Sequence, residues 1–212
     1  MFQDLPVSPR RATLEEIRRW VADRQKHVLT FLGYSGAGYE VPERMLADAE
    51  AVLAGHDPAR VIVNVGATAI GIGAVYVPAR QRGFETLGIV SSRALKGKAR
   101  WSPAVDHVFV IEDDTWGGTD AEGKLHPTSS AIVAVSDELV AIGGGDISRA
   151  ELWAGREAGK PCRFIPAEFD HGSALRWARD AGRPAPTRFA SVIGETPWSV
   201  PTRVPGAAAA RP

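Results

Sequence analysis

Residues 137–151, DELVAIGGGDISRAE, combine residue types that can hold a phosphate group. An apolar stretch ends in three consecutive glycines, and a segment with a helical pattern follows. Glycines allow the backbone to approach a ligand closely, and the unpaired N–H groups of a first helical turn attract an anion. We therefore expect a phosphate or sugar-phosphate site at this turn. The residues that we assign to it are Gly143, Gly144, Gly145, Asp146, Ile147 and Ser148.

Each part of this turn also has a simpler interpretation. The glycines can serve only to make a tight strand-to-helix turn. Asp146 can cap the helix, and its charge would then repel a phosphate placed directly there. The hydroxyl of Ser148 can bind a ligand or act as a second cap.

Glu151 lies about one helical turn after the glycines. A carboxylate in a first turn is favoured by the helix dipole alone. Alternatively, it can bind ribose hydroxyls or stabilise an oxocarbenium-like centre while an N-glycosidic bond breaks. Glu151 is therefore the candidate catalytic residue.

Two earlier strands also end in glycine-bearing turns that precede helices. The first turn contributes Gly33, Tyr34 and Ser35 to the predicted ligand site. The second contributes Gly66, Ala67 and Thr68, although this segment contains no G-x-G-x-x-G pattern. Three such turns in one chain favour a shared ligand pocket over three unrelated turns.

Short apolar strands alternate with helical segments along the chain, which predicts an α/β fold. We expect a single domain with a three-layer, Rossmann-like parallel sheet and helices on both faces, with ligands at the carboxyl ends of the strands. The predicted strands are 27–32, 61–65, 86–90, 107–111, 139–142 and 162–165. The predicted helices are 13–26, 42–54, 74–82, 128–136, 148–158 and 171–180.

Length and composition narrow the class of protein. The 212 residues, 44% of them hydrophobic, suit one domain with a sizeable core. We place a nucleotide-binding domain at 1–183 and a Pro/Ala-rich C-terminal extension at 184–212. Lys plus Arg equals Asp plus Glu, at 25 each, which argues against a nucleic-acid partner. No segment has the signal-peptide pattern or the roughly 18 apolar residues of a membrane span, so we expect a cytoplasmic protein without a membrane partner.

We expect no metal site. The adjacent carboxylates Asp113 and Asp114 lack a histidine at ligand spacing and more simply begin a solvated loop over 113–127. Trp116 in that loop can stack on a base or belong to the core or a lid. The single cysteine, Cys162, follows the pattern of an inert buried thiol and rules out an internal disulfide framework.

Together, the three turns resemble the LONELY GUY family, also described as lysine-decarboxylase-like, and its superfamily, which includes molybdenum-cofactor carrier proteins. Residues 32–35 are similar to the family's C-G-S-S loop, and residues 65–73 to its G-G-G-x-x-G-x-x-G loop. Residues 86–89 resemble its V-I-G-V strand, and residues 143–151 its P-G-G-x-G-T-x-x-E signature. The likeness extends over residues 28–168. It implies a pocket for a nucleotide or a molybdopterin-type cofactor, and a homodimer.

Several positions depart from this pattern. Gly143 replaces the signature's proline, and Ile147 replaces the glycine of its G-T pair. The positions of the family's Arg-Lys pair, whose Arg is catalytic and orients the substrate, fall near Thr128 and Ser129. Arg149 or Lys124 could supply the missing positive charge. The loop 116–127 is longer than the family's connection and can form a lid or a specificity element.

Three functions fit these residues. The first is binding of a nucleotide or nucleotide-like cofactor by a carrier or sensor, which the loss of the Arg-Lys pair favours. The second is an enzyme, a phosphoribohydrolase that cleaves the N-glycosidic bond of a nucleoside 5′-monophosphate with Glu151. The third is an interaction domain that shares only the fold. The expected partners are a small-molecule nucleotide or sugar phosphate and, from the resemblance, a second copy of the chain.

Overall fold

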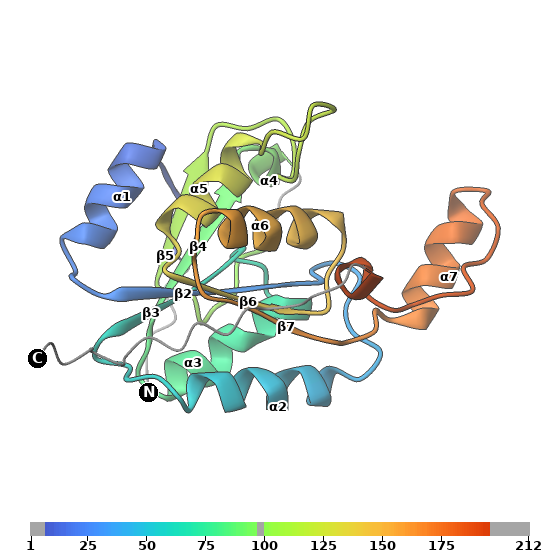
Figure 1. The fold of residues 1–212 in the computed structure, drawn as a ribbon, viewed down its shortest axis with the longest axis horizontal. Helices are drawn as coiled ribbons and strands as arrows, with labels where there is room; N and C mark the ends of the chain where they lie inside the picture. Colours follow the sequence, from blue (N-terminus) through green and yellow to red (C-terminus); the bar gives the residue numbers. More distant parts are fainter. Residues whose placement is uncertain (1–6, 97–99, 196–212) are drawn as a thin grey trace, which may run out of the picture.

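A computed structural model describes residues 7–96 and 100–195 of the chain. Seven strands form one sheet in the order β1-β5-β4-β3-β2-β6-β7, and every neighbouring pair is parallel (Figure 1). The fold is therefore the predicted α/β sheet with helices on both faces. The strands are β1 Arg10–Arg11, β2 His27–Gly33, β3 Val61–Val65, β4 Glu85–Ser91, β5 His107–Ile111, β6 Glu138–Ile142 and β7 Cys162–Ile165.

Helices cover the sheet in two layers, each with its own apolar core. Figure 1 shows α2 and α3 below the sheet and α1, α5 and α6 above it. The helices are α1 Leu14–Ala22, α2 Pro42–Leu53, the 3-10 turn η1 Gly71–Val75, α3 Tyr76–Gln81, α4 Arg93–Lys96, α5 Pro127–Val135, α6 Asp146–Glu157, α7 His171–Asp180 and the 3-10 turn η2 Val192–Glu195.

Alternate residues of each central strand enter opposite cores, as the strand period of two requires. In β3, Val61, Val63 and Val65 pack under α2 and α3, whereas Ile62 packs toward α1, α5 and α6. Asn64 shares the face of Ile62 and is fully buried. This register places one polar side chain inside an otherwise apolar layer.

Local sequence signals explain where several helices begin. Thr13 and Glu16 form a reciprocal capping box at the start of α1, as their spacing predicts. Proline stands in the first turn of α2 and of α5, where its missing N–H is not needed. The helix α1 ends at Ala22, four residues before the predicted end, because a turn follows with Gln25 at φ 52°.

The strand order creates a switch point between β2 and β6. From β2 the chain proceeds outward through β3, β4 and β5, and then returns through α5 to place β6 on the other side of β2. Gly33 of β2 stands opposite Ile142 of β6 at the carboxyl ends of the two strands. Parallel sheets commonly bind ligands at such a point.

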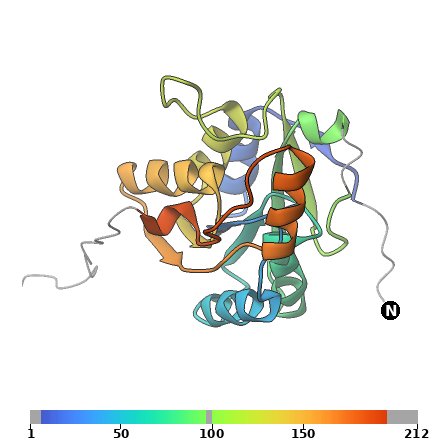
Figure 2. The same ribbon diagram turned by 90° about the vertical axis from the view of Figure 1, so that its right-hand side faces the viewer.

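Two features lie at the carboxyl-end side of the sheet. Helix α7 stands apart from both helical layers and faces the viewer in Figure 2. Part of the segment assigned to the C-terminal extension returns to the sheet edge: Ser191 donates a hydrogen bond to the Gly144 carbonyl (2.8 Å), and Ile193 is fully buried. The predicted extension beyond residue 195 lies outside the described residues.

Candidate functional site

A cleft of about 1210 Å³ opens at the carboxyl ends of β2, β3 and β4, beside the switch point. The first turn of α6 and the start of α5 form its other wall, and Trp177 of α7 reaches its edge. Apolar side chains make up much of the lining, including Phe31, Ile72 and Ile132. Such a cleft suits a ligand with a flat apolar part and a few polar groups.

The structure brings residues from all three predicted turns to this one cleft. The predicted site residues that line it are Gly33, Tyr34, Ser35, Gly66, Thr68, Gly145, Asp146, Ile147, Ser148 and Glu151. Ala67, Gly143 and Gly144 do not line it. The N–H of Ala67 instead donates to the Tyr76 hydroxyl inside the core (3.1 Å), so this residue supports the turn from behind.

Gly143 and Gly144 give the third turn its shape. Their φ angles are +59° and +117°, in the left-handed region that side chains disfavour. A Cβ at Gly144 would also lie 2.6 Å from the Cβ of Ser148. These two glycines therefore turn the chain from β6 into α6, while Gly145, with open space around it, faces the cleft.

The N-terminus of α6 is positioned to receive an anion. Gly145 is its N-cap residue and offers no side-chain cap. The first N–H groups of a helix have no partner within the helix, and the helix dipole adds partial positive charge. Because Gly145, Asp146, Ile147 and Ser148 line the cleft, this end of α6 borders it directly.

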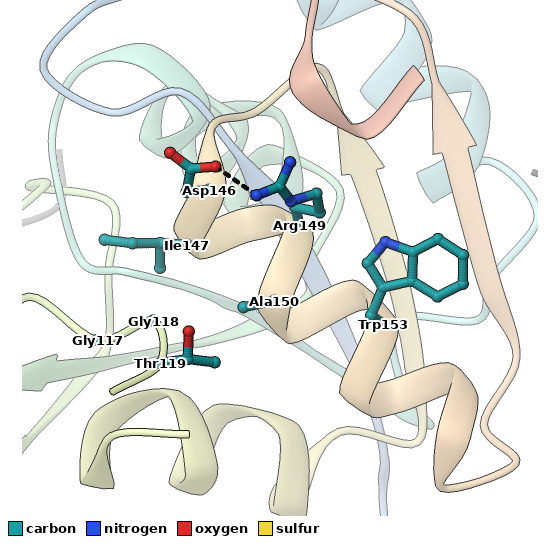
Figure 3. A pocket seen from close by; sticks show the side chains of 8 residues that line it. All are labelled: Gly117, Gly118, Thr119, Asp146, Ile147, Arg149, Ala150 and Trp153. Carbon is teal, nitrogen blue, oxygen red and sulfur yellow. Dashed lines mark hydrogen bonds and ion pairs between the residues drawn. The ribbon is translucent and has the colours of Figure 1, made fainter. Parts of the chain in front are cut away.

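Asp146 does not cap the helix, in contrast to one of the interpretations of the sequence. Its carboxylate accepts a hydrogen bond from the Arg149 guanidinium at 2.7 Å, on the exposed side of the first turn (Figure 3). This pairing offsets the negative charge next to the helix N-terminus. Ser148 donates to the Gly33 carbonyl (3.1 Å), which ties α6 to the first turn.

Tyr39 holds the first and third turns together. Its hydroxyl donates to the carbonyl of Ile142 (2.8 Å) and accepts from the N–H of Tyr34 (3.1 Å). Burial raises the pKa of this phenol, so it stays neutral and can perform both roles. No local sequence signal distinguishes Tyr39 from any other residue in the turn.

Glu151 is buried, with 4% of its surface exposed, and lies against the cleft. The Ser129 hydroxyl donates a hydrogen bond to the Glu151 carboxylate (2.6 Å) and accepts one from the N–H of Gly118 (2.7 Å). Burial raises the pKa of Glu151 to about 7, and the Ser129 bond only partly opposes this shift. Near neutral pH the carboxyl group can therefore exist in either protonation state.

Ser129 stands near the positions where the resemblance places two basic residues, and here it donates a hydrogen bond to Glu151. Neither proposed substitute for the missing charge lines the cleft: Arg149 pairs with Asp146, and Lys124 lies in the exposed part of the 113–127 loop. Among the residues that the structure describes, Arg100 is the only basic residue in the cleft lining. The sequence offers no signal for its role.

The 113–127 segment is folded against the molecule. The Asp113 carboxylate accepts hydrogen bonds from the Thr115 hydroxyl (2.7 Å) and the Thr128 N–H (2.9 Å). These bonds outweigh desolvation and lower the pKa of Asp113 to about 2. Asp113 thus anchors the loop, and Trp116 lines the cleft with 53% of its surface exposed.

A second hollow of about 280 Å³ lies between this loop and the outer side of α6 (Figure 3). Residues 117–119 form one side, and Arg149 and Trp153 form the other. Ile147 and Asp146 belong to both hollows, so the first turn of α6 separates them.

Within residues 7–96 and 100–195, no cluster of three or more histidine, cysteine or acidic side chains is arranged to bind a metal ion. No helix in the same ranges combines the length and apolar character needed to cross a membrane.

Comparison with known proteins yields similar folds but no family assignment. No family model matches the chain, and no curated protein matches it. The molybdenum cofactor carrier protein of Chlamydomonas reinhardtii is similar over 66% of this chain and 76% of its own, with 21% identity and a TM-score of 0.48. The molybdenum cofactor binding protein of the phototrophic bacterium Rippkaea orientalis is similar over 74% and 85%, with 15% identity and a TM-score of 0.48. At these values the likeness carries no argument about a ligand of this chain.

Proposed function

We propose that this protein binds a nucleotide or nucleotide-like phosphorylated cofactor in the large cleft, as a carrier or sensor. The observation that carries the proposal is the N-terminus of α6, which has no side-chain cap and borders a cleft of about 1210 Å³ at the sheet's switch point. The oxygens of a phosphate at this end would accept hydrogen bonds from the first N–H groups of the helix, which have no partner within it. The apolar walls then suit the heterocycle of the ligand.

The charges around the site agree with an anionic ligand. Asp146 is paired with Arg149, and burial favours the neutral form of Glu151 up to about pH 7. Arg100 adds a positive charge at the cleft. A molybdopterin-type cofactor belongs to the same ligand class, because it joins a fused heterocycle to a phosphate.

Isothermal titration calorimetry with adenosine 5′-monophosphate, adenosine and ribose 5-phosphate tests this proposal. We expect the monophosphate to bind at least tenfold more tightly than adenosine, because only the monophosphate can use the helix N-terminus. Equal affinities for the nucleoside and the nucleotide would contradict an anion site at α6.

A second candidate function is hydrolysis of the N-glycosidic bond of a nucleoside monophosphate. The observation that favours it is a buried carboxyl group beside the cleft whose pKa is about 7, a value suited to proton transfer at neutral pH. Against it, Ser129 is the hydrogen-bond partner of Glu151, where a hydrolase of the resembling family would provide a basic residue nearby.

Incubation of the protein with adenosine 5′-monophosphate distinguishes the two functions. We expect no release of adenine and ribose 5-phosphate above the uncatalysed rate. Release by the wild type that is lost in Glu151→Gln would replace the carrier proposal with the hydrolase. Release that is equal in both proteins would point to a contaminating enzyme and would count against hydrolysis at this site.

We also propose that the protein forms a homodimer and that it is cytoplasmic. The homodimer rests on the family resemblance, and the location rests on the sequence pattern.

A further inference from the structure

Asn64 lines the cleft, and one of its side-chain polar atoms is buried without a hydrogen-bond partner in the part of the chain that the structure describes. The residue is fully buried, lines the cleft, and lies on the face of β3 that points toward α5. Its side-chain oxygen, Oδ1, has no hydrogen-bond partner in residues 7–96 and 100–195. Buried polar side chains in folded proteins nearly always have a partner, so an unpaired oxygen beside a cleft indicates a missing ligand group or water.

A chain of hydrogen bonds fixes the orientation of this amide. Ser136 Oγ lies 2.7 Å from the Ile132 carbonyl, which can only accept, so Ser136 uses its single hydroxyl proton there. Thr30 Oγ1, 2.6 Å from Ser136 Oγ, must therefore be the donor in that contact. Having used its own proton, Thr30 can only accept from Asn64.

The amide NH₂ of Asn64 therefore faces Thr30, at 3.1 Å, and its oxygen faces away from Thr30. The reversed amide would place two acceptors against each other. This ordering removes the usual ambiguity between amide oxygen and nitrogen. Asn64 thus holds a buried acceptor beside the cleft that requires an N–H or O–H donor.

The depth of Asn64 restricts what can supply that donor. Asn64 is in register with Thr30, three residues before Gly33 at the end of β2. At about 3.3 Å per residue, this places Asn64 about 10 Å below the level of Gly33, although it is the penultimate residue of its own strand. A group that reaches it passes between the sheet and α5, beside Ile89 and Ile132, which favours a flat and largely apolar group over a sugar.

Two other buried hydroxyls in the lining, those of Ser91 and Thr128, also lack hydrogen-bond partners among the described residues. Ser91 lies four residues beyond Leu87, the β4 residue that is in register with Asn64, so it is nearer the mouth. The Thr128 hydroxyl is close enough to Asp113 to lower the pKa of that carboxyl group. We therefore place the site on Asn64 alone.

We propose that Asn64 Oδ1 is a specificity-determining acceptor for an N–H group on the edge of a planar heterocycle, with Thr30 as its positioning residue. This inference rests on the proposed function, because it assigns the heterocycle end of the same ligand. A ligand with its phosphate at α6 and its ring at β3 lies across the switch point, from β6 over β2 to β3.

Pairs of ligands that differ in one N–H group test the proposal. Adenosine 5′-monophosphate is compared with purine riboside 5′-monophosphate, which lacks the exocyclic amine, and guanosine 5′-monophosphate with inosine 5′-monophosphate. In the wild type, we expect the donor-bearing member of at least one pair to bind at least about tenfold more tightly. In Asn64→Leu, we expect that ratio to fall to within about twofold, with the affinity for the donor-lacking member retained.

Thr30→Val provides a second variant if Asn64→Leu does not fold. Valine keeps the shape of threonine, but its side chain cannot accept a hydrogen bond from the Asn64 amide. The amide is therefore free to rotate. We expect the preference for the donor-bearing ligand to shrink in this variant, whereas a purely structural role of Thr30 would lower both affinities equally.

Other outcomes separate this inference from the proposed function. If wild type binds both members of each pair equally, or if Asn64→Leu keeps the preference, the Asn64 oxygen is satisfied by a buried water and the inference is wrong. If no member of either pair binds, the proposed function itself fails, and the inference fails with it.

Discussion

Glu151 makes the stability of the folded chain depend on pH. Burial raises its pKa from an ordinary 4.5 to about 7 in the folded state. The folded protein therefore holds this proton more tightly than the unfolded chain does. The contribution to stability is fully present below about pH 4.5 and is lost as the pH rises through about 7.

We expect the free energy of unfolding to fall by up to about 3 kcal/mol from this residue between about pH 5 and about pH 8. Urea unfolding of the wild type and of Glu151→Gln at the two pH values measures it, because only the wild type carries this titration. A pH dependence that is identical in the two proteins would show that Glu151 is ionised in the folded state throughout this range.

The sequence identifies some of these residues and not others. The position of Glu151 one turn after a glycine run predicts a site residue, and the structure places it at the cleft. The turn and glycine patterns do not point to Asn64, although a polar residue inside the apolar run VIVNV is a visible signal. Its partners Thr30 and Ser136 are distant in sequence, so the hydrogen-bond chain depends on the tertiary fold.

At the scale of elements, the turn between β6 and α6 depends on glycine at some positions and tolerates other residues elsewhere. Gly144 has φ +117°, and a Cβ there would meet Ser148 at 2.6 Å. Gly145 has φ −95° and nothing within 4 Å of an added Cβ. Substitutions at these two neighbouring glycines can therefore be compared directly, with Gly145 as the control for Gly144.

We expect Gly144→Ala to destabilise the protein by about 1–3 kcal/mol or more, because it combines backbone strain with a steric clash. Gly145→Ala should change the free energy of unfolding by less than about 1 kcal/mol. Chemical denaturation of the two variants measures the difference. Similar losses in both would mean that the turn adopts another conformation.

The main strands and helices followed from hydrophobic pattern and turn residues, whereas the short elements did not. The predicted strands 61–65, 107–111 and 162–165 coincide with β3, β5 and β7. The two-residue strand β1 was not predicted, because Arg10 and Arg11 have no apolar pattern and pair only with the edge of β5. The single turn of α4 is likewise too short for a periodic signal.

For the molecule as a whole, alternation of strands and helices predicted a parallel sheet but not the order of its strands. The order places β6 beside β2, and this long-range pairing brings the third turn to the first. Ser191 and Ile193 also make long-range contacts: Ser191 donates a hydrogen bond to Gly144, and Ile193 is buried. Neither contact leaves a local signature in the sequence.

The whole-molecule proposal combines an anion site at α6, a flat apolar cleft and a buried acceptor beside it. Gly145 allows the first of these to be tested by charge, since a Cβ added there meets no atom within 4 Å beyond its chain neighbours. Gly145→Glu places a carboxylate at the helix N-terminus, and Gly145→Gln places a neutral group of the same size there.

The most direct measurement is calorimetric titration of adenosine 5′-monophosphate into the wild type, Gly145→Gln and Gly145→Glu. We predict binding to the wild type and to Gly145→Gln, and an affinity at least about tenfold lower in Gly145→Glu than in Gly145→Gln, because like charges repel at the helix end. Equal affinities in the two variants, or no binding to the wild type, would contradict the proposal that this protein holds a phosphorylated ligand at the start of α6.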